Sequence, residues 1–139
     1  MIYMSLLTNE MEEVIQEFLL FEDWEDKYTY IIDCGKKLEN LDNKYKTDYN
    51  LVVGCTSQVW FTTYKDSSNK CFFLADSNAY IVKGLISILL RIFSGKTVEE
   101  IQKIDIEDFF SVLGLKEHLS INRSNGFFAM VNKIKNYTS

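Results

Sequence analysis

Cys55 is the residue of this 139-residue chain whose surroundings best suit nucleophilic chemistry. It follows Gly54 and precedes the small hydroxylated residues Thr56 and Ser57, where a polar loop leads into an apolar alternating run. Cysteine is usually among the most buried residue types, whereas a thiol flanked by small residues on a loop can attack or be attacked. Thiolate is the reactive form in sulfur exchange. Because no Lys, Arg or His adjoins Cys55, activation must come from spatial neighbours or from a partner protein.

The other two cysteines and the single histidine favour packing roles. Cys34 falls near the end of a predicted helix and Cys71 on a predicted strand, where cysteine behaves as a small hydrophobe. His118 lies between two predicted helices, where a capping or packing histidine is commoner than a general base. Cys-His-Asp catalysis would require distant segments to converge. The odd cysteine count without a C-x-x-C pair fits neither a zinc site nor a disulfide framework, so we expect reduced thiols and no bound metal.

Composition narrows the function classes. A hydrophobic content of 47% excludes intrinsic disorder, and the length predicts one domain over residues 1–139. The net charge of −5 argues against a nucleic-acid partner and is compatible with a partner that presents a positive surface. All six glycines are isolated, so the sequence predicts no phosphate-binding loop.

No segment has the pattern of a membrane span or a signal peptide. The most apolar run, residues 81–93, is interrupted by Lys83 and Arg91 and is far shorter than a span. The N-terminus offers only a short apolar stretch over residues 1–7. We therefore expect a soluble, cytoplasmic protein without a membrane partner.

Hydrophobic periodicity predicts helices on both sides of one β-hairpin. Asn9 and Glu12 resemble a capping box for the first helix, and Asp76, Ser77 or Asn78 is expected to cap the central helix. Helices are predicted over residues 9–21, 22–37, 79–94, from 97, over 106–113 and from 120 or 122 to about 136; strands over 57–64 and 71–75; a turn over 66–69; and a surface loop over 39–50. This order indicates an α+β fold, a small antiparallel β-sheet packed against several helices.

Several segments together resemble the SufE family of sulfur-acceptor proteins of iron–sulfur cluster assembly. They occur in the family's order and cover nearly the whole chain. The segments are Trp24-Glu25-Asp26-Lys27-Tyr28, Ile31-Ile32-Asp33, Gly35-Lys36-Lys37-Leu38, Gly54-Cys55, Ser57-Gln58-Val59-Trp60, Ala75-Asp76-Ser77, Ile81-Val82-Lys83-Gly84-Leu85, Leu115 through Leu119 and Arg123-Ser124-Asn125-Gly126. The cysteine motif in combination with the Ile-Val-Lys-Gly and Arg-Ser-Asn-Gly segments is the specific part of the resemblance.

The resemblance implies a fold shared with IscU-type scaffolds and a sulfur carrier with one persulfide-accepting cysteine, here Cys55. A pyridoxal-phosphate cysteine desulfurase of the SufS type would be the donor and an iron–sulfur scaffold complex the acceptor. The pyridoxal phosphate would belong to the desulfurase, so this chain would hold no cofactor and would activate its partner rather than act as an independent enzyme. Gly54, Gln58, Asp76 and Arg123 are expected to support the loop or the partner contact, with Arg123 in a turn before the last helix.

Two other function classes stay open on sequence grounds. One is an iron–sulfur cluster scaffold that binds iron through Cys34, Cys55, Cys71 or His118, which would make the purified protein coloured. The other is a non-catalytic interaction module in which Cys55 only packs, which would leave its thiol unreactive. The sequence also leaves the oligomeric state open, and a homodimer remains among the partners considered.

Overall fold

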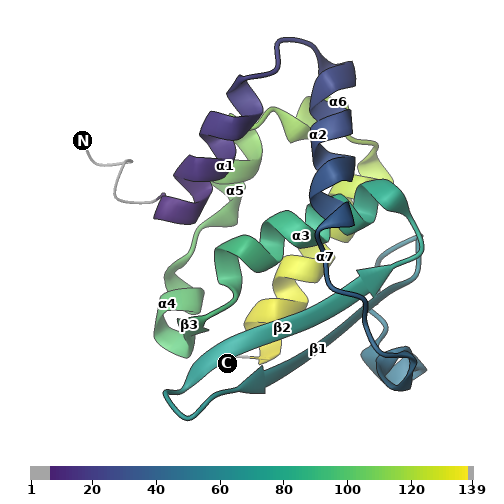
Figure 1. Ribbon diagram of the computed structural model, residues 1–139, viewed down its shortest axis with the longest axis vertical. Coiled ribbons are helices and arrows are strands. Elements are labelled where there is room, and N and C mark those ends of the chain that lie inside the picture. Colours follow the sequence, from purple (N-terminus) through teal and green to yellow (C-terminus); the bar gives the residue numbers. More distant parts are fainter. Residues whose placement is uncertain (1–6, 138–139) are drawn as a thin grey trace.

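The computed structural model describes residues 7–137, so all but the last residue of the apolar stretch at 1–7 lies outside this range. Helices α1 (Asn9–Leu19) and α2 (Trp24–Lys36) form a hairpin above the central helix α3 (Tyr80–Phe93) (Figure 1). Helix α3 packs against α1, α2, strand β2 and the last helix, α7 (Ile121–Tyr137). The remaining elements are the 3₁₀ turns η2 (Asn43–Tyr45) and η3 (Asp48–Asn50), strands β1 (Val59–Lys65), β2 (Lys70–Ser77) and β3 (Lys96–Thr97), and helices α4 (Val98–Lys103), α5 (Ile106–Val112) and α6 (Leu115–His118).

The sheet confirms the predicted hairpin. Strands β1 and β2 pair antiparallel from Val59 opposite Ser77 to Lys65 opposite Cys71. The alternation of the sequence holds, because Val59 and Phe61 are both fully buried in the core. The short strand β3 pairs with the start of β2 and was not predicted from the sequence. Together with the helices, the sheet confirms the α+β class.

Two glycines let α2 and α3 cross closely. A Cβ atom on Gly84 of α3 would lie 2.0 Å from the carbonyl oxygen of Ile31 in α2, which is far inside contact distance. A Cβ on Gly35 of α2 would in turn lie 2.7 Å from the backbone nitrogen of Gly84. Only glycine fits at these two positions, so the glycine of the Ile-Val-Lys-Gly segment serves packing between the two helices. Helix α3 is thereby fixed at the centre of the molecule.

The predicted cap of the first helix was wrong. Thr8 precedes α1, and its hydroxyl accepts a hydrogen bond from the N–H of Met11 at 3.2 Å, in place of the expected Asn9. Asn9 is already the first helical residue, because Thr8 has the extended backbone that a capping residue adopts. At the start of α4, where a helix was predicted from residue 97, Thr97 and Glu100 form a capping box.

The expected places of Asp76 and Arg123, at the starts of the two helices that flank the cysteine site, also need correction. Asp76 does not cap α3, because β2 continues through Ser77 and Ala79 takes the capping position without a side-chain bond. Arg123 does not lie in a turn, because α7 begins at Ile121 and already includes it. The loop predicted over residues 39–50 contains η2 and η3, and Leu41 within it is buried.

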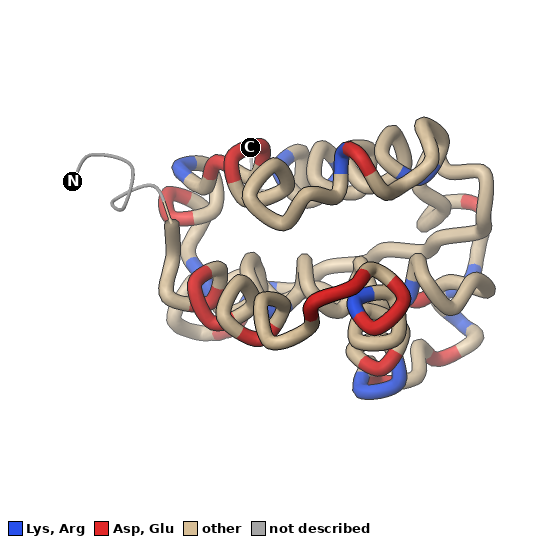
Figure 2. The backbone as a smooth tube through the Cα atoms, turned by 90° about the horizontal axis from the view of Figure 1, so that it is seen from above, with Lys and Arg blue, Asp and Glu red and all other residues tan. Residues whose placement is uncertain are grey.

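Acidic residues concentrate on the α1–α2 hairpin. Between residues 9 and 37 there are nine acidic and three basic side chains, a net charge of −6, compared with −5 for the whole chain. Figure 2 shows these acidic positions along α1, through the connection and into the first turns of α2. Carboxylates in the first turn of a helix are favoured by its dipole, which accounts for Glu10, Glu12, Glu25 and Asp26. Among the described residues no helix has both the length and the apolar character needed to cross a membrane.

Candidate functional site

Cys55 lies on a short loop that is closed at its base. The N–H of Val52 donates to the carbonyl of Val59 at 2.9 Å, and Leu51 forms an isolated bridge with Trp60. Within this loop Gly54 has a φ of 101°, a backbone conformation that residues with a Cβ rarely adopt. The closed base fixes where the loop leaves the protein, and Gly54 provides the bend that directs Cys55 back toward the helices.

The thiol of Cys55 faces the first turns of α7. Its Sγ atom lies 3.6 Å from the carbonyl oxygen of Gly126, 71 residues further along the chain. The thiol borders a pocket of about 360 Å³ between the loop, α3 and α7. The pocket wall has an apolar part (Val82, Leu85, Phe127 and Met130) and a polar part (Thr56, Ser57, Ser120, Asn122 and Arg123). Cys55 is half-buried, whereas Cys34 and Cys71 are buried, so Cys55 is the most accessible of the three free thiols.

Burial raises the pKa of the Cys55 thiol above its ordinary value of 9.0. A thiolate in this position would lose hydration, and the facing carbonyl of Gly126 can accept a hydrogen bond from S–H but offers nothing to a sulfur anion. In this pose Cys55 is therefore held as a neutral thiol. Nucleophilic attack requires either movement of the loop or a positive group from outside the chain.

Arg123 lies on the rim of the same pocket. Its backbone N–H donates to the hydroxyl of Ser120 at 3.1 Å, which caps the first turn of α7. The Arg123 side chain is exposed, and no carboxylate among residues 7–137 forms an ion pair with it. The fold thus brings Arg123 and Cys55 to one pocket and leaves the guanidinium available to a ligand or partner.

Asp76 and Gln58 lie at the base of the cysteine loop. The carboxylate of Asp76, which is 6% exposed, accepts from the N–H of Ser77 at 2.8 Å and pairs with Lys46 at 3.1 Å and Lys83 at 3.5 Å. Burial alone would raise the pKa of Asp76, but the Ser77 N–H and the two ammonium groups outweigh it and lower the pKa below 3.8. Asp76 therefore ties the segment before the loop to β2 and α3. The backbone carbonyl of Gln58 accepts from the backbone N–H of Asn78 at 3.4 Å, which joins the other end of the loop to the same region.

The other candidate nucleophiles and ligands lie away from this pocket. Cys71 is 1% exposed within β2. The His118 ring stacks on Trp24 with 3.7 Å between centroids, and its Nδ1 lies 3.0 Å from the carbonyl oxygen of Gly114. This arrangement is a packing and capping role for the histidine. Within residues 7–137 no three His, Cys, Asp or Glu side chains converge in a way that could hold a metal ion.

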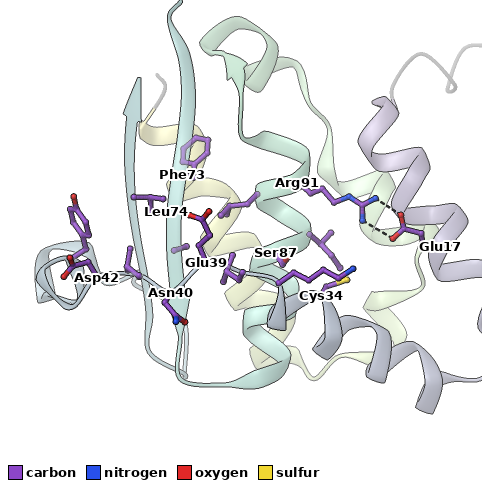
Figure 3. A pocket seen from close by; sticks show the side chains of 16 residues that line it. Glu17, Cys34, Glu39, Asn40, Asp42, Phe73, Leu74, Ser87 and Arg91 are labelled. Carbon is purple, nitrogen blue, oxygen red and sulfur yellow. Dashed lines mark hydrogen bonds and ion pairs between the residues drawn. The ribbon is translucent and has the colours of Figure 1, made fainter. Parts of the chain in front are cut away.

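A larger cavity of about 690 Å³ lies between the end of α2, the segment that follows it, β2 and α3 (Figure 3). Cys34 forms part of its wall, and at one end the guanidinium of Arg91 donates to both carboxylate oxygens of Glu17, at 3.0 and 2.6 Å. Glu17 also accepts from the hydroxyl of Tyr30 at 2.9 Å. Burial raises the pKa of the Cys34 thiol above its ordinary value. The charged groups at this end thus bind one another, so we place the candidate site in the smaller pocket that contains Cys55.

Comparison with known proteins decides the family. The family model SufE, described as an Fe-S metabolism associated domain, matches residues 12–138. The chain belongs to the SufE family. An uncharacterized SufE-like protein of Rhizobium etli is 42% identical over 133 residues, which cover 94% of this chain and 90% of the relative. A second uncharacterized SufE-like protein, from Rhizobium meliloti strain 1021, is 42% identical over 128 residues, which cover 90% of this chain and 91% of the relative.

The fold is found in a solved structure as well. The solution structure of a hypothetical protein from Thermus thermophilus superposes with a TM-score of 0.75 and covers 93% of each chain at 14% sequence identity. At that identity the likeness shows the fold alone. Membership of the SufE family gives the chain a role in iron–sulfur metabolism.

Sequence reasoning missed the residues that shape the pocket around the thiol. Phe127 and Met130 fall within the helix predicted to end at about residue 136 and were given no part in the site, and Gly126 appeared only in a motif. Gly126 carried a usable signal, because a glycine within a helical pattern costs helix stability relative to alanine. Its partner could not be named from sequence, since Cys55 is 71 residues away.

Proposed function

We propose that Cys55 is a persulfide acceptor, through which this SufE-family chain takes sulfur from a cysteine desulfurase of the SufS type and passes it to an iron–sulfur scaffold complex. The observation that supports the proposal most directly is a half-buried thiol on a short loop, facing a pocket much larger than one sulfur atom. Such a pocket has room for the added sulfur and an apolar wall that keeps reductants away. The family's role in iron–sulfur metabolism agrees with this chemistry.

The transfer is a thiol–persulfide exchange. The Cys55 thiolate attacks the outer sulfur of the donor persulfide, a new S–S bond forms at Sγ, and the S–S bond of the donor breaks. The donor cysteine leaves as a thiolate, and the proton of Cys55 passes to solvent or to a base of the partner. No oxidant is consumed, because the transferred sulfur atom keeps its oxidation state and only moves from one cysteine sulfur to another. Delivery repeats the exchange with an acceptor thiolate of the scaffold complex.

The partner contact is proposed around the mouth of the pocket. Val53, which is 91% exposed, adjoins Gly54 on the cysteine loop, and Ile121, which is 79% exposed, begins α7 beside the pocket. Exposed apolar residues next to Arg123, which forms no ion pair within residues 7–137, suit docking of another protein. Asp76 and Gln58 then support the loop from its base, and the pyridoxal phosphate stays with the desulfurase. In this proposal one SufE-like domain over residues 1–139 does its work in the cytoplasm.

The deciding experiment is intact-mass and peptide analysis after incubation with a cysteine desulfurase and cysteine. The wild-type chain should gain ~32 Da, one sulfur atom added by exchange, on the Cys55 peptide. Cys55→Ser keeps the size of the side chain but cannot form a persulfide, so it should show no adduct and should not accelerate the desulfurase. Cys34→Ser and Cys71→Ser serve as matched controls and should retain the adduct.

Two results would overturn the proposal. Full stimulation of the desulfurase by Cys55→Ser would remove Cys55 from the transfer. An equal adduct on Cys34 or Cys71 would contradict a single acceptor. A chain purified with bound iron that is lost in Cys55→Ser would instead favour the cluster-scaffold alternative.

A further inference from the structure

The larger cavity, between the end of α2, residues 38–45, β2 and α3, has no part in the proposed sulfur transfer. Its volume of about 690 Å³ falls within the range of about 300–1,000 Å³ that is usual for small-molecule pockets. A well-packed domain otherwise leaves few voids larger than a water molecule. Among residues 7–137, no residue that lines this cavity also lines the pocket of Cys55. The chain therefore has a second place that could hold a ligand, separate from its thiol.

Much of the cavity wall is apolar and comes from regular elements. Phe73 of β2 and Ile88 of α3 are buried. Leu38, which follows α2, and Leu90 of α3 are partly exposed and pack against the core. Apolar surface that a ligand removes from water stabilises the complex, so this wall favours a ligand with an apolar body.

The charged groups at one end of the cavity are already occupied with one another. The guanidinium of Arg91 donates to both carboxylate oxygens of Glu17 and also lies 3.4 Å from an oxygen of Glu13. Lys37 takes the C-terminal capping position of α2, where the helix dipole favours a positive charge. The pKa of Glu17 is lowered first by the hydrogen bond from Arg91 and, among smaller effects, by the charge of Lys37. Both cations of the cavity wall thus act on Glu17.

The carboxylates of residues 38–45 are not occupied in this way. Neither Glu39 nor Asp42 forms an ion pair within residues 7–137, and Asp42 uses only Oδ1, which accepts from the backbone N–H of Lys44 at 3.1 Å. In Figure 3 both residues lie away from the Arg91–Glu17 pair. Three acidic and two basic residues line the cavity, which leaves a net charge of −1. An anionic ligand would meet unpaired carboxylates here, whereas a cation would be attracted.

We propose that the larger cavity binds a small organic cation, an ammonium or guanidinium group on an apolar body, with the charged group at Glu39 and Asp42 and the body against β2 and α3. A carboxylate accepts charge-assisted hydrogen bonds from either group. The ring of Tyr45, which also lines the cavity, offers a face that attracts cations. This inference goes beyond the proposed function, because binding here needs neither Cys55 nor a partner protein.

Three probes of nearly equal size test the site and its charge preference. Phenethylamine carries the cation, phenethyl alcohol is neutral and phenylacetate is the anion. Each is titrated at low ionic strength into the isotope-labelled full chain, and the backbone amide signals are followed by NMR. Phenethylamine should give saturable shifts confined to residues 38–45, β2 and α3. Phenethyl alcohol should bind more weakly and phenylacetate most weakly.

Glu39→Gln tests the charged contact. Glu39 is exposed, so the variant should fold as wild type does. Its affinity for phenethylamine should fall by about two- to fivefold, the range of an exposed ion pair, while its affinity for phenethyl alcohol should not change. Glu22→Gln removes an exposed carboxylate that lies outside the cavity wall. This matched control should bind all three probes as wild type does.

Ser87→Leu tests the location. Ser87 lies on α3 and lines the cavity, so a leucine there would occupy part of the space. This variant should lose the binding of all three probes while its melting temperature does not fall, because leucine favours a helix more than serine does.

Three results would overturn the inference. Shifts that do not saturate, or that map outside the cavity wall, would exclude the site. Phenylacetate that binds as tightly as phenethylamine, or a Glu39→Gln variant with unchanged phenethylamine affinity, would exclude the cationic class of ligand. A folded Ser87→Leu variant that still binds phenethylamine would place the ligand elsewhere. None of these measurements depends on sulfur transfer, so they stand whatever the outcome at Cys55.

Discussion

The acidity of a single thiol decides when Cys55 can react. Burial raises its pKa, and the described residues that contact it offer a carbonyl oxygen rather than a cation. A carrier of labile sulfur gains from this arrangement, because a neutral thiol is a poor nucleophile toward adventitious disulfides. The same burial implies that a desulfurase must supply the missing activation when it docks.

The first prediction concerns the pH dependence of that thiol. Because the neutral form is favoured in the folded chain, the alkylation rate of Cys55 should reach half its maximum at a higher pH than that of a small model thiol. Rates at the Cys55 peptide, followed by mass spectrometry from neutral to alkaline pH, give the midpoint. A midpoint at or below that of the model thiol would contradict the buried pose.

Arg123 carries the second prediction. A guanidinium can bind a carboxylate through two parallel N–H donors, which an ammonium cannot reproduce. Arg123→Lys should therefore weaken desulfurase binding or stimulation while the melting temperature stays within error, since the side chain is exposed. Calorimetric titration against the desulfurase measures the affinity. Equal affinity and equal stimulation would reduce Arg123 to a surface residue.

At the scale of elements, the site depends on where α7 begins. Ser120 caps the first turn of α7 by accepting from the backbone N–H of Arg123, and this turn carries the arginine and part of the polar wall of the pocket. Ser120→Ala should lower the free energy of unfolding by about 0.5–2 kcal/mol through the lost cap, measured by urea titration. We also expect faster Cys55 alkylation, because a frayed first turn loosens the pocket. Thr8→Ala removes a comparable cap from α1 and should leave the alkylation rate unchanged.

Asp76 connects three elements and predicts an acid-sensitive fold. Its lowered pKa means that the carboxylate contributes stability above its ordinary pKa of 3.8, and that this contribution is lost as the pH falls through the lower folded-state value. Asp76→Asn should cost about 1–3 kcal/mol at neutral pH, since charged hydrogen bonds to Ser77 and two lysines are lost. Below the folded-state pKa the two proteins should converge in stability. A difference in unfolding free energy that stays the same at every pH would show that the ion pairs of Asp76 are not its cause.

The sequence predicted the elements better than their ends. Period-two alternation predicted β1, and apolar spacing predicted α2 and α3, because these patterns follow from burying one face. The caps of α1 and α3 were wrong, since several polar residues in a row compete for the capping position and backbone geometry decides among them. Strand β3 is two residues long, too short to leave a pattern.

The candidate site was only half visible in the sequence. Small neighbours made Cys55 conspicuous, but its contact with Gly126 spans 71 residues and depends on how α7 packs against α3. Local pattern carries no information on such a convergence. The pairing of Asp76 with Lys46 and Lys83 was missed for the same reason.

At the scale of the whole molecule, the three thiols fall into two groups, two in the buried core and one at the smaller pocket. Cys34 and Cys71 belong to the buried core, at 8% and 1% exposure, whereas Cys55 packs against that core from outside. Stability and sulfur transfer are therefore expected to be separable by choice of cysteine. We expect a substitution in the core to lower stability without removing sulfur transfer, and a substitution of Cys55 to remove sulfur transfer without lowering stability.

Cys71→Ser tests this separation. Cys71 packs among buried apolar side chains of the core while its carbonyl accepts from the N–H of Gly95 at 2.7 Å. A serine hydroxyl at this position is buried without an assured partner, so the free energy of unfolding should fall by about 1–3 kcal/mol. Sulfur accepted per folded molecule should stay at the wild-type level, because the backbone pairing of β2 and the pocket are untouched. Cys55→Ser should show the opposite pattern, wild-type stability with no sulfur accepted.

Urea unfolding and persulfide mass analysis on the same samples compare the two variants. A loss of transfer in Cys71→Ser, at a temperature where the chain remains folded, would mean that core and site are coupled and that the sheet itself takes part in positioning the loop.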